Sequence, residues 1–283
     1  MDGATLVPES IARVGCFLVI LLVMSVWELL APRRRLSVRK SPRWLSNLGL
    51  VVLNVLLVRL VLPLTALGTA ALAAERGWGL LNQWAAPVWV RFVIAVAALD
   101  LAIYVQHVLF HAVPALWRLH MVHHADLDFD VTTGLRFHTF EILISTFLKI
   151  GVVFALGPPV WAVLTFEILL NGTSMFNHGN VRIPPRLDRL LRFVVVTPDM
   201  HRVHHSVDRR EANTNFGFNL PWWDYLLRTY RAQPAAGHDA MQIGVSHLRE
   251  ERRVDRLPGM LAIPFARSTG DYPIAGREKS SAM

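Results

Sequence analysis

The sequence predicts an all-α membrane protein: a polytopic bundle of about four to five helical spans with a helical cap on one side. Hydrophobic residues make up 53% of the 283-residue chain and charged residues only 18%, and the mean hydropathy is +0.37. The apolar residues are collected in runs of roughly 20 residues, the length of a helix that crosses a bilayer. Polar stretches between and after these runs contain the histidines.

The first predicted span covers residues 11–30, and the charges at its two ends set its direction. The residues before it include two acids and no base, whereas six basic residues lie between Arg33 and Arg43. Positive charge is concentrated in cytoplasmic loops, so we expect the N-terminus outside and the basic loop inside. The net charge of +8 is carried by such loops rather than by one face of a soluble domain, which argues against nucleic-acid binding.

The second predicted span, residues 48–74, returns to the outside. It contains Arg59 and Pro63, which are unusual within a membrane helix. A charged side chain near mid-membrane is costly, so we expect Arg59 to have a partner inside the bundle.

Three further apolar runs complete the predicted bundle. Residues 88–113 lead back to the inside, and residues 140–156 and 160–176 form a hairpin around the helix-breaking Gly-Pro-Pro at 157–159. With an outside start and five crossings, ten of the 12 histidines collect at one membrane face, the cytoplasmic one.

Nine histidines form clusters whose spacing suits metal binding. His107 and His111 are four residues apart and therefore share one face of a helix. The pattern His-x-x-His-His occurs at 120–124 and again at 201–205, and a single histidine lies in the Asn-His-Gly-Asn sequence at 177–180. Nine imidazoles suit two metal ions with four or five nitrogen ligands each. The candidate ligands are His107, His111, His120, His123, His124, His178, His201, His204 and His205.

Several common metal and cofactor chemistries lack their residues in this chain. It has no Glu-x-x-His pair of the soluble di-iron carboxylate bundles, no His-Glu-x-x-His of the zinc proteases and no Gly-x-Gly-x-x-Gly loop for a nucleotide. A nearly pure imidazole site at the water–lipid boundary favours a metal centre that acts on a molecule dissolved in the bilayer, and iron with O2 attacks unactivated C–H bonds. Two other classes stay open: a non-redox zinc-binding membrane protein and a divalent-metal transporter.

The order and spacing of the motifs resemble those of the fatty acid hydroxylase and sterol desaturase superfamily of integral membrane enzymes. The resemblance rests on HVLFH, LWRLHMVHH, LRFHTFE, FNHGN, TPDMHRVHH and NTNFGFNLPWWDYLLRTYR, which lie within residues 99–231. It implies a non-haem di-iron oxygenase that uses O2 to hydroxylate or desaturate a lipid, such as a sterol or a fatty acyl chain. It also implies an external electron donor, a ferredoxin or cytochrome reductase system, and zinc can replace iron in the purified protein.

Carried over residue by residue, the resemblance assigns two iron ions to the nine histidines above. His138 of the RFHTFE motif is a further candidate ligand, and Thr139 stands where the family often has proline. Glu141, Asp199 and Asp208 are candidates for orienting the ligands, because carboxylates often accept the second N–H of a metal-bound imidazole.

Polarity and the resemblance together divide the chain into three predicted parts. Residues 1–86 contain N-terminal membrane helices and the basic loop, and residues 87–231 form the catalytic domain. Residues 232–283 form a polar tail. About the last forty residues lack apolar periodicity, and we expect these to be mobile. The aromatic and basic residues 219–231 are expected to anchor the cap at the lipid headgroups and to close the site. We expect a multi-pass protein of a bacterial inner membrane with the histidines on the cytoplasmic side.

Overall fold

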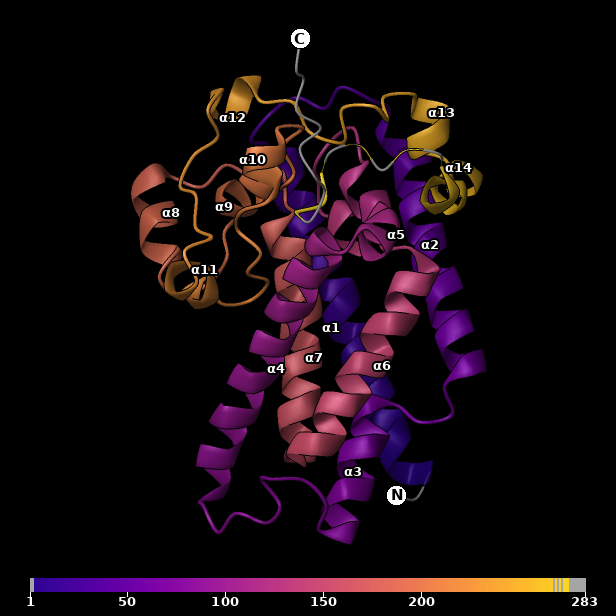
Figure 1. Ribbon diagram of the computed structural model, residues 1–283, viewed down its shortest axis with the longest axis vertical. Helices are drawn as coiled ribbons and strands as arrows, with labels where there is room; N and C mark the ends of the chain where they lie inside the picture. The colour runs from indigo at the N-terminus through magenta and orange to yellow at the C-terminus, as the bar shows by residue number, and fades with distance from the viewer. Residues whose placement is uncertain (1–2, 267, 269, 271, 275–283) are drawn as a thin grey trace.

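A bundle of apolar helices and a cap of short helices and loops make up the two parts of the molecule (Figure 1). The structure is a computed structural model that describes residues 3–266, 268, 270 and 272–274, with side chains from residue 11 onward. All the regular elements in these residues are helices, and none of these residues belongs to a strand. The first helix begins at the end of the bundle opposite the cap. The predicted all-α class with a helical cap is therefore confirmed.

Six helices build the bundle. They are α1 (Gly3–Leu30), α2 (Lys40–Val61), α3 (Ala66–Arg76), α4 (Val88–Ala112), α6 (Thr139–Leu156) and α7 (Val160–Asn177). Four segments are long and apolar enough to cross a membrane, and these are Ile11–Leu30, Lys40–Arg76, Val88–Ala112 and Thr139–Leu156. The fifth predicted run forms α7, which packs against α1, α3 and α4. The bundle thus agrees with the prediction of about four to five spans.

The second predicted span consists of two helices rather than one. α2 ends at Val61, and α3 begins at Ala66, where the Thr65 hydroxyl accepts a hydrogen bond from the Gly68 N–H at 3.1 Å. Pro63 lies in the gap. It interrupts the helix because proline has no N–H for a helical hydrogen bond and disfavours the helical conformation at the residue before it. The break lets α3 pack against α6 and α7, while α2 lies beside α6.

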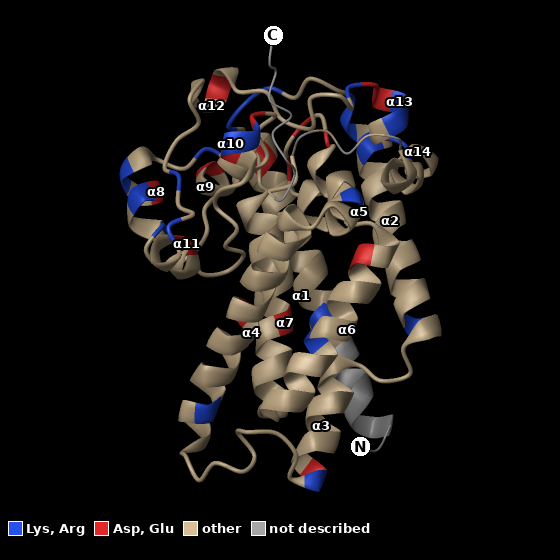
Figure 2. Cartoon of the chain, viewed as in Figure 1, with Lys and Arg blue, Asp and Glu red and all other residues tan. Residues whose placement is uncertain are grey.

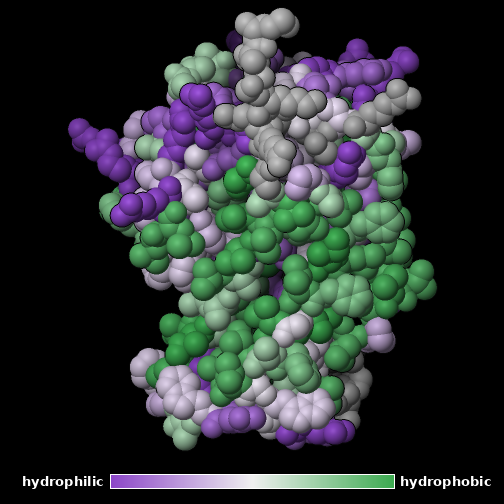
Figure 3. Space-filling model, in the orientation of Figure 1, coloured by the Kyte–Doolittle hydropathy of each residue, from purple (hydrophilic) through white to green (hydrophobic). Residues whose placement is uncertain are grey.

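Charged residues largely avoid the middle of the bundle. Figure 2 shows most of them in the cap, and Figure 3 shows a belt of hydrophobic residues below it. A lipid-facing surface requires such a belt, so this is a membrane protein. Arg59 is exposed on the outside of α2, so the prediction of a partner inside the bundle is wrong. Glu167 of α7 is buried, and it pairs with Lys149 at 2.5 Å and with Arg13 at 3.1 Å.

The cap begins at a sharp turn of the chain at Pro114. α4 ends at Ala112, and Pro114 starts α5 (Pro114–His124), because proline fits the first turn of a helix, where an N–H would have no partner. The other cap helices are η1 (Thr133–Leu135), α8 (Pro185–Leu191), α9 (Pro198–His204), α10 (Arg209–Ala212), α11 (Trp222–Leu226), α12 (Gly237–Ala240), α13 (Glu251–Val254), α14 (Leu257–Ala262) and η2 (Ile263–Phe265).

The described part of the predicted polar tail is folded onto the cap. Met260, Ile263 and Tyr272 join Trp117 of α5 in one buried hydrophobic cluster. The sequence did not reveal this packing, because short helices and loops bury single apolar residues without a repeating pattern. Residues 275–283 of the predicted mobile tail lie outside the described residues.

Buried charges tie the basic loop to the segment that follows the first histidine pattern. Arg43 is fully buried and donates to Asp126 at 2.9 Å and to Asp130. The indole N–H of Trp44 also donates to Asp130, at 2.9 Å. Carboxylates and a guanidinium in a dry interior are tolerable only when they compensate one another. The loop predicted to be cytoplasmic is therefore a structural part of the cap.

Replacing Arg43 with alanine should destabilise the fold by about 3–5 kcal/mol. The reason is that Asp126 and Asp130 would keep their buried positions and lose the cation that compensates them. Thermal unfolding in detergent micelles measures the effect, with Arg189→Ala on the exposed side of α8 as the control. An Arg43→Ala protein that unfolds at the same temperature as the control would contradict this expectation.

Candidate metal centre

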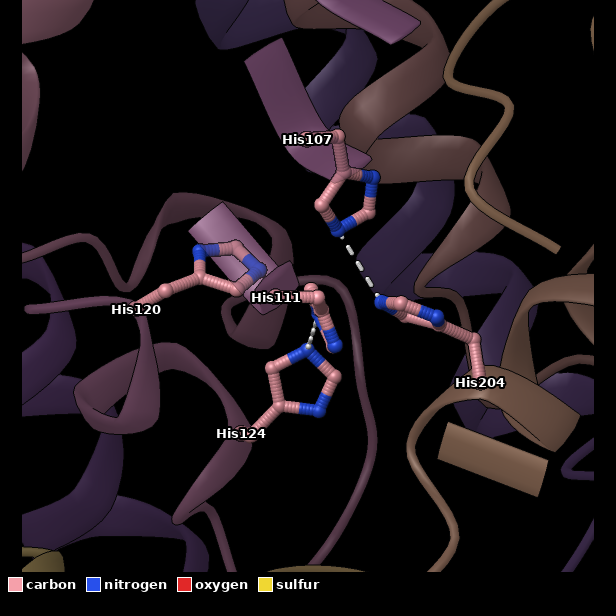
Figure 4. A group of neighbouring side chains, drawn as sticks. All are labelled: His107, His111, His120, His124 and His204. Carbon is pink, nitrogen blue, oxygen red and sulfur yellow. Dashed lines mark hydrogen bonds between the residues drawn. The ribbon is translucent and has the colours of Figure 1, made fainter. Parts of the chain in front are cut away.

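All nine candidate ligands come together where the bundle meets the cap, and they divide into two groups. Within each group, one nitrogen of every ring lies within 4.8 Å of one nitrogen of every other ring. The five-histidine group consists of His107, His111, His120, His124 and His204 (Figure 4). The four-histidine group consists of His123, His178, His201 and His205. All nine side chains are buried.

Helical spacing places four rings of the five-histidine group. His107 and His111 lie one turn apart near the end of α4, and His120 and His124 lie one turn apart on α5. Because α5 follows α4 after a sharp turn, both pairs point into the same space (Figure 4). His123 lies on a neighbouring face of α5 and belongs to the other group.

The second histidine pattern is shared between the two groups. His204, on α9, joins the five-histidine group, whereas His201 and the helix-ending His205 join the four-histidine group. His178 immediately follows α7 and completes the four-histidine group. Each of the two His-x-x-His-His patterns therefore contributes imidazole rings to both groups.

Hydrogen bonds at the outer nitrogens determine which nitrogen faces the group. His107 Nδ1 donates to the Phe216 carbonyl at 2.8 Å, and His204 Nδ1 donates to the Thr214 carbonyl at 2.7 Å. A carbonyl can only accept, so both neutral rings carry the proton on Nδ1 and a lone pair on Nε2. The two Nε2 atoms are 3.0 Å apart (Figure 4). Two lone pairs at this distance repel each other unless a cation lies between them.

Side chains hold two more rings of the five-histidine group. His120 Nδ1 lies 2.6 Å from a carboxylate oxygen of Glu141, and His111 Nδ1 donates to the side-chain oxygen of Asn213 at 3.1 Å. Glu141 therefore lies against a candidate ligand, where the sequence analysis expected it. Residues 213–216 contact three of the five rings, a role that the sequence analysis missed. The NTNFGF motif, which contains these residues, could have indicated this role, but it was used only as one of the motifs of the superfamily resemblance.

The four-histidine group is centred on His178. Its Nε2 lies 3.1 Å from the Nε2 atoms of His123 and His201 and 3.2 Å from that of His205. Its Nδ1 donates to the Ser174 carbonyl at 2.7 Å. The Nδ1 atoms of the other three rings are buried and have no hydrogen-bond partner among the described residues. The rings of this group are therefore less firmly oriented than those of the five-histidine group.

The donor set fits two divalent metal ions. Two nitrogens that bind one ion at about 2.1 Å and at right angles lie about 3.0 Å apart, close to the separations in both groups. Burial lowers the pKa of His120 to about 3. The pKa values of His123 and His204 are also well below the usual value, because burial and the neighbouring imidazoles both disfavour a protonated ring. The rings are therefore neutral, which is the form that binds metal.

The remaining candidate residues have other contacts. His138 belongs to neither group, and its Nδ1 accepts from the Phe140 N–H at 3.2 Å at the start of α6. Asp199 pairs with two arginines of the cap. Asp208 accepts from the Arg210 N–H at 2.8 Å and caps α10. Of the three carboxylates expected near the ligands, Glu141 contacts a ring of the two groups, whereas Asp199 and Asp208 contact other parts of the described cap.

Residues 92–229 match the model of the fatty acid hydroxylase family. Over this region the chain is similar to the fatty acid hydroxylase family. The matched region contains all nine rings of the two groups and the segment 213–216 that orients three of them. The sequence resemblance to this superfamily is thereby confirmed.

Proteins similar to this chain are named as lipid hydroxylases and monooxygenases. An ornithine lipid hydroxylase of Rhizobium tropici is 32% identical over 70% of this chain and 56% of that protein. The alkylglycerol monooxygenase of Homo sapiens is 27% identical over 54% of this chain and 32% of that protein. The cholesterol 25-hydroxylase of Mus musculus is 29% identical over 50% of this chain and 47% of that protein. The chain therefore spans 32% to 56% of the length of these relatives. No solved structure matches it significantly.

We expect Glu141→Ala to weaken metal retention by about 10- to 100-fold, the usual effect of losing a carboxylate that orients a ligand. The physical reason is that His120 would lose its partner at Nδ1. The measurement is the metal content of purified protein after dialysis against increasing chelator. Asp208→Asn is the control, since Asp208 caps α10 and lies outside both groups. Equal retention in the two variants would show that Glu141 does not support the site.

A chelator should remove metal from the two groups in separate steps, the four-histidine group first. Three of its four rings lack a partner at Nδ1, whereas four rings of the five-histidine group have one. Elemental analysis of the protein at each chelator concentration gives the number of ions retained. Asn213→Ala, which frees His111, should bring the two steps closer together. Loss of both ions in one step from the unaltered protein would contradict the inequality of the groups.

Proposed function

We propose that the protein is a membrane-bound non-haem di-iron oxygenase that uses O2 and external electrons to hydroxylate a membrane lipid. The observation that carries the proposal is the pair of buried imidazole groups at one end of an apolar bundle. Hydroxylation, rather than desaturation, is supported by the names of the relatives, which are hydroxylases and monooxygenases. The same names support a substrate with a long hydrocarbon part, such as an acyl lipid, an ether lipid or a sterol.

The two groups would hold one iron ion each, with five and four imidazole ligands. Iron bound there supplies the activation of O2 that attack on an unactivated C–H bond requires. The chain itself supplies neutral ligands and a dry surrounding. Phe137 stacks on His123 with 4.4 Å between ring centroids, and the Phe216 ring lies 5.1 Å from that of His111. These rings exclude water, so that an oxidised centre meets the substrate rather than solvent.

The substrate would reach the five-histidine group sideways from the bilayer. Val105 and Leu109, two residues before and after His107, are exposed on the opposite, lipid-facing side of α4. Phe140, at the start of α6, is exposed as well and precedes Glu141, the partner of His120. A hydrocarbon chain would therefore meet apolar side chains on α4 and α6 at the depth of the group without crossing water. The carbon atom that reacts would lie at the same depth in the bilayer as the cap end of these helices.

We also propose that the cap faces the cytoplasm in a bacterial inner membrane. The basic loop between α1 and α2 belongs to the cap end of the bundle, and Figure 2 shows many basic residues there. This side is the cytoplasmic one by the positive-inside rule. A ferredoxin or a cytochrome reductase system would deliver electrons on that side. Residues 87–231 would form the catalytic domain, and parts of residues 1–86 and 232–283 complete its cap.

The alternative functions are less well supported. A divalent-metal transporter should carry ligands along a path through the membrane, whereas the nine imidazoles lie together at one end of the bundle. A non-redox zinc protein would use the same rings, since imidazole binds zinc as well as iron. The family and its named relatives favour the oxygenase.

Elemental mass spectrometry of protein purified from iron-supplemented cells tests the metal centre. We expect two iron ions per chain. The double variant His120→Ala, His204→Ala should lose the ion of the five-histidine group, because it removes two of that group's five rings, one from each of two helices. His238→Gln is the control, since His238 lies outside both groups. Membranes supplied with reductant and 18O2 should then yield a lipid that carries one 18O atom. Iron-loaded protein that leaves every lipid unchanged would contradict the oxygenase, and loss of two hydrogens without 18O would indicate a desaturase.

A further inference from the structure

In the described part of the chain, the aromatic rings packed around the two histidine groups are phenylalanines with one exception. Among the described residues, six such rings have centroids within 6.5 Å of a ring in either group. They are Phe110, Phe129, Phe137, Phe216, Phe218 and Trp117. A phenyl ring resists the loss of an electron, whereas an indole gives up one electron far more easily. The described rings around the groups thus include one that is readily oxidised, Trp117.

Trp117 contacts the five-histidine group and a second oxidisable ring. It is fully buried on α5, and its centroid lies 4.9 Å from that of His111 and 5.2 Å from that of His124. It also stacks on Tyr272, with 5.4 Å between centroids and 12° between the ring planes. Trp117 and Tyr272 are therefore stacked on each other, and Trp117 also contacts two candidate metal ligands.

Tyr272 extends this contact to the polar side of the cap. Its hydroxyl donates to the Val207 carbonyl at 2.6 Å and accepts from the Ser246 N–H at 3.0 Å. Tyr272, Val207 and Ser246 line a surface cavity of about 400 Å³, together with Arg209. The phenol therefore lies at the wall of a polar surface cavity, while the opposite end of the ring pair touches the histidines.

We propose that Trp117 and Tyr272 form a one-electron relay that protects the histidines when O2 has reacted and no lipid is in place. The inference rests on the proposed oxygenase function. During hydroxylation the oxidised centre takes its electrons from a C–H bond of the substrate. Without substrate, the nearest side chains would be oxidised instead, and these are the ligand imidazoles. Trp117 offers an easier source of electrons in contact with two of them.

The relay moves one electron at a time and leaves both side chains unchanged. Trp117 gives one electron to the oxidised centre and regains one from Tyr272. As Tyr272 loses that electron, its hydroxyl turns away from the Val207 carbonyl and releases its proton to water in the cavity, which Val207 also lines. A soluble thiol or ascorbate in the cavity then returns one hydrogen atom, that is one electron and one proton, to the phenoxyl oxygen. The reductant is oxidised, and the centre is reduced by one electron.

Peptide mass spectrometry tests the relay by locating the oxidised side chains. Iron-loaded protein is exposed to O2 with a limiting amount of dithionite, without lipid, thiol or ascorbate. In the unaltered protein, we expect added oxygen on Trp117 and Tyr272 and little on the ligand histidines. In Trp117→Phe, which keeps an aromatic ring in the core, oxidation of Tyr272 should be lost, and oxidation of His111 and His124 should increase.

Two further variants and a metal assay separate the relay from packing effects. Tyr272→Phe keeps the stacked ring, so oxidation should accumulate on Trp117. Tyr104→Phe is the matched control and should leave the pattern unchanged, because the Tyr104 ring packs on Phe216 at 6.4 Å and not on a ligand. Iron content shows that each variant retains its centre. Persistent oxidation of Tyr272 in Trp117→Phe would overturn the relay alone. Unaltered iron-loaded protein that consumes no O2 would overturn the oxygenase function, and the relay with it.

Discussion

The close approach of neutral imidazole nitrogens in a dry interior is the constraint on which the rest of this structure depends. Nitrogens of neighbouring rings lie 3.0–3.2 Å apart, although two lone pairs at this distance repel each other unless a cation lies between them. Protonation of a ring would relieve this repulsion, but burial holds the pKa of rings such as His120 far below neutrality. The protein must therefore orient the rings for metal by contacts at their outer nitrogens.

One short segment provides many of these contacts. Residues 213–216 accept hydrogen bonds from three rings, two of them through main-chain carbonyls. The segment is itself fixed, because the buried carboxylate of Asp224 accepts from the N–H groups of Phe216 and Gly217 at 2.8 Å. Asn215 adopts the left-handed backbone conformation, with φ of 53°, which asparagine tolerates better than most residues. The aromatic segment 219–231, expected to anchor and close the site, thus also supports the ligands through Asp224.

Polar contacts at the boundary join the cap to the bundle. Asp100, buried in α4, accepts from the Asn219 amide and from the Trp223 indole, both at 2.7 Å. On the other side of the cap, Arg43 of α2 binds the carboxylates that follow the first histidine pattern. A buried polar group costs free energy unless its partners are in place, so these contacts allow few relative positions of cap and bundle. The imidazoles of α4 and α9 meet because the two parts are locked together.

The sequence by itself determined the fold class and the set of candidate ligands. A bilayer imposes length and polarity on every span, and imidazole is a metal ligand in any packing, so both features can be recognised without knowing the contacts. The break at Pro63 was visible as a residue, but the new position of α3 depended on how it packs against α6 and α7. Likewise, the single apolar residues of the predicted tail showed no pattern before they met Trp117.

Only the tertiary structure decided how the histidines are divided and oriented. His123 and His124 are neighbours in the chain but belong to different groups, because successive side chains of a helix point about 100° apart. Which space each one enters depends on where α4, α7 and α9 lie around α5. The carbonyls of Thr214 and Phe216 could not be recognised in advance either, since every residue has a main-chain carbonyl. Their role arises from position alone, and position is a property of the folded chain.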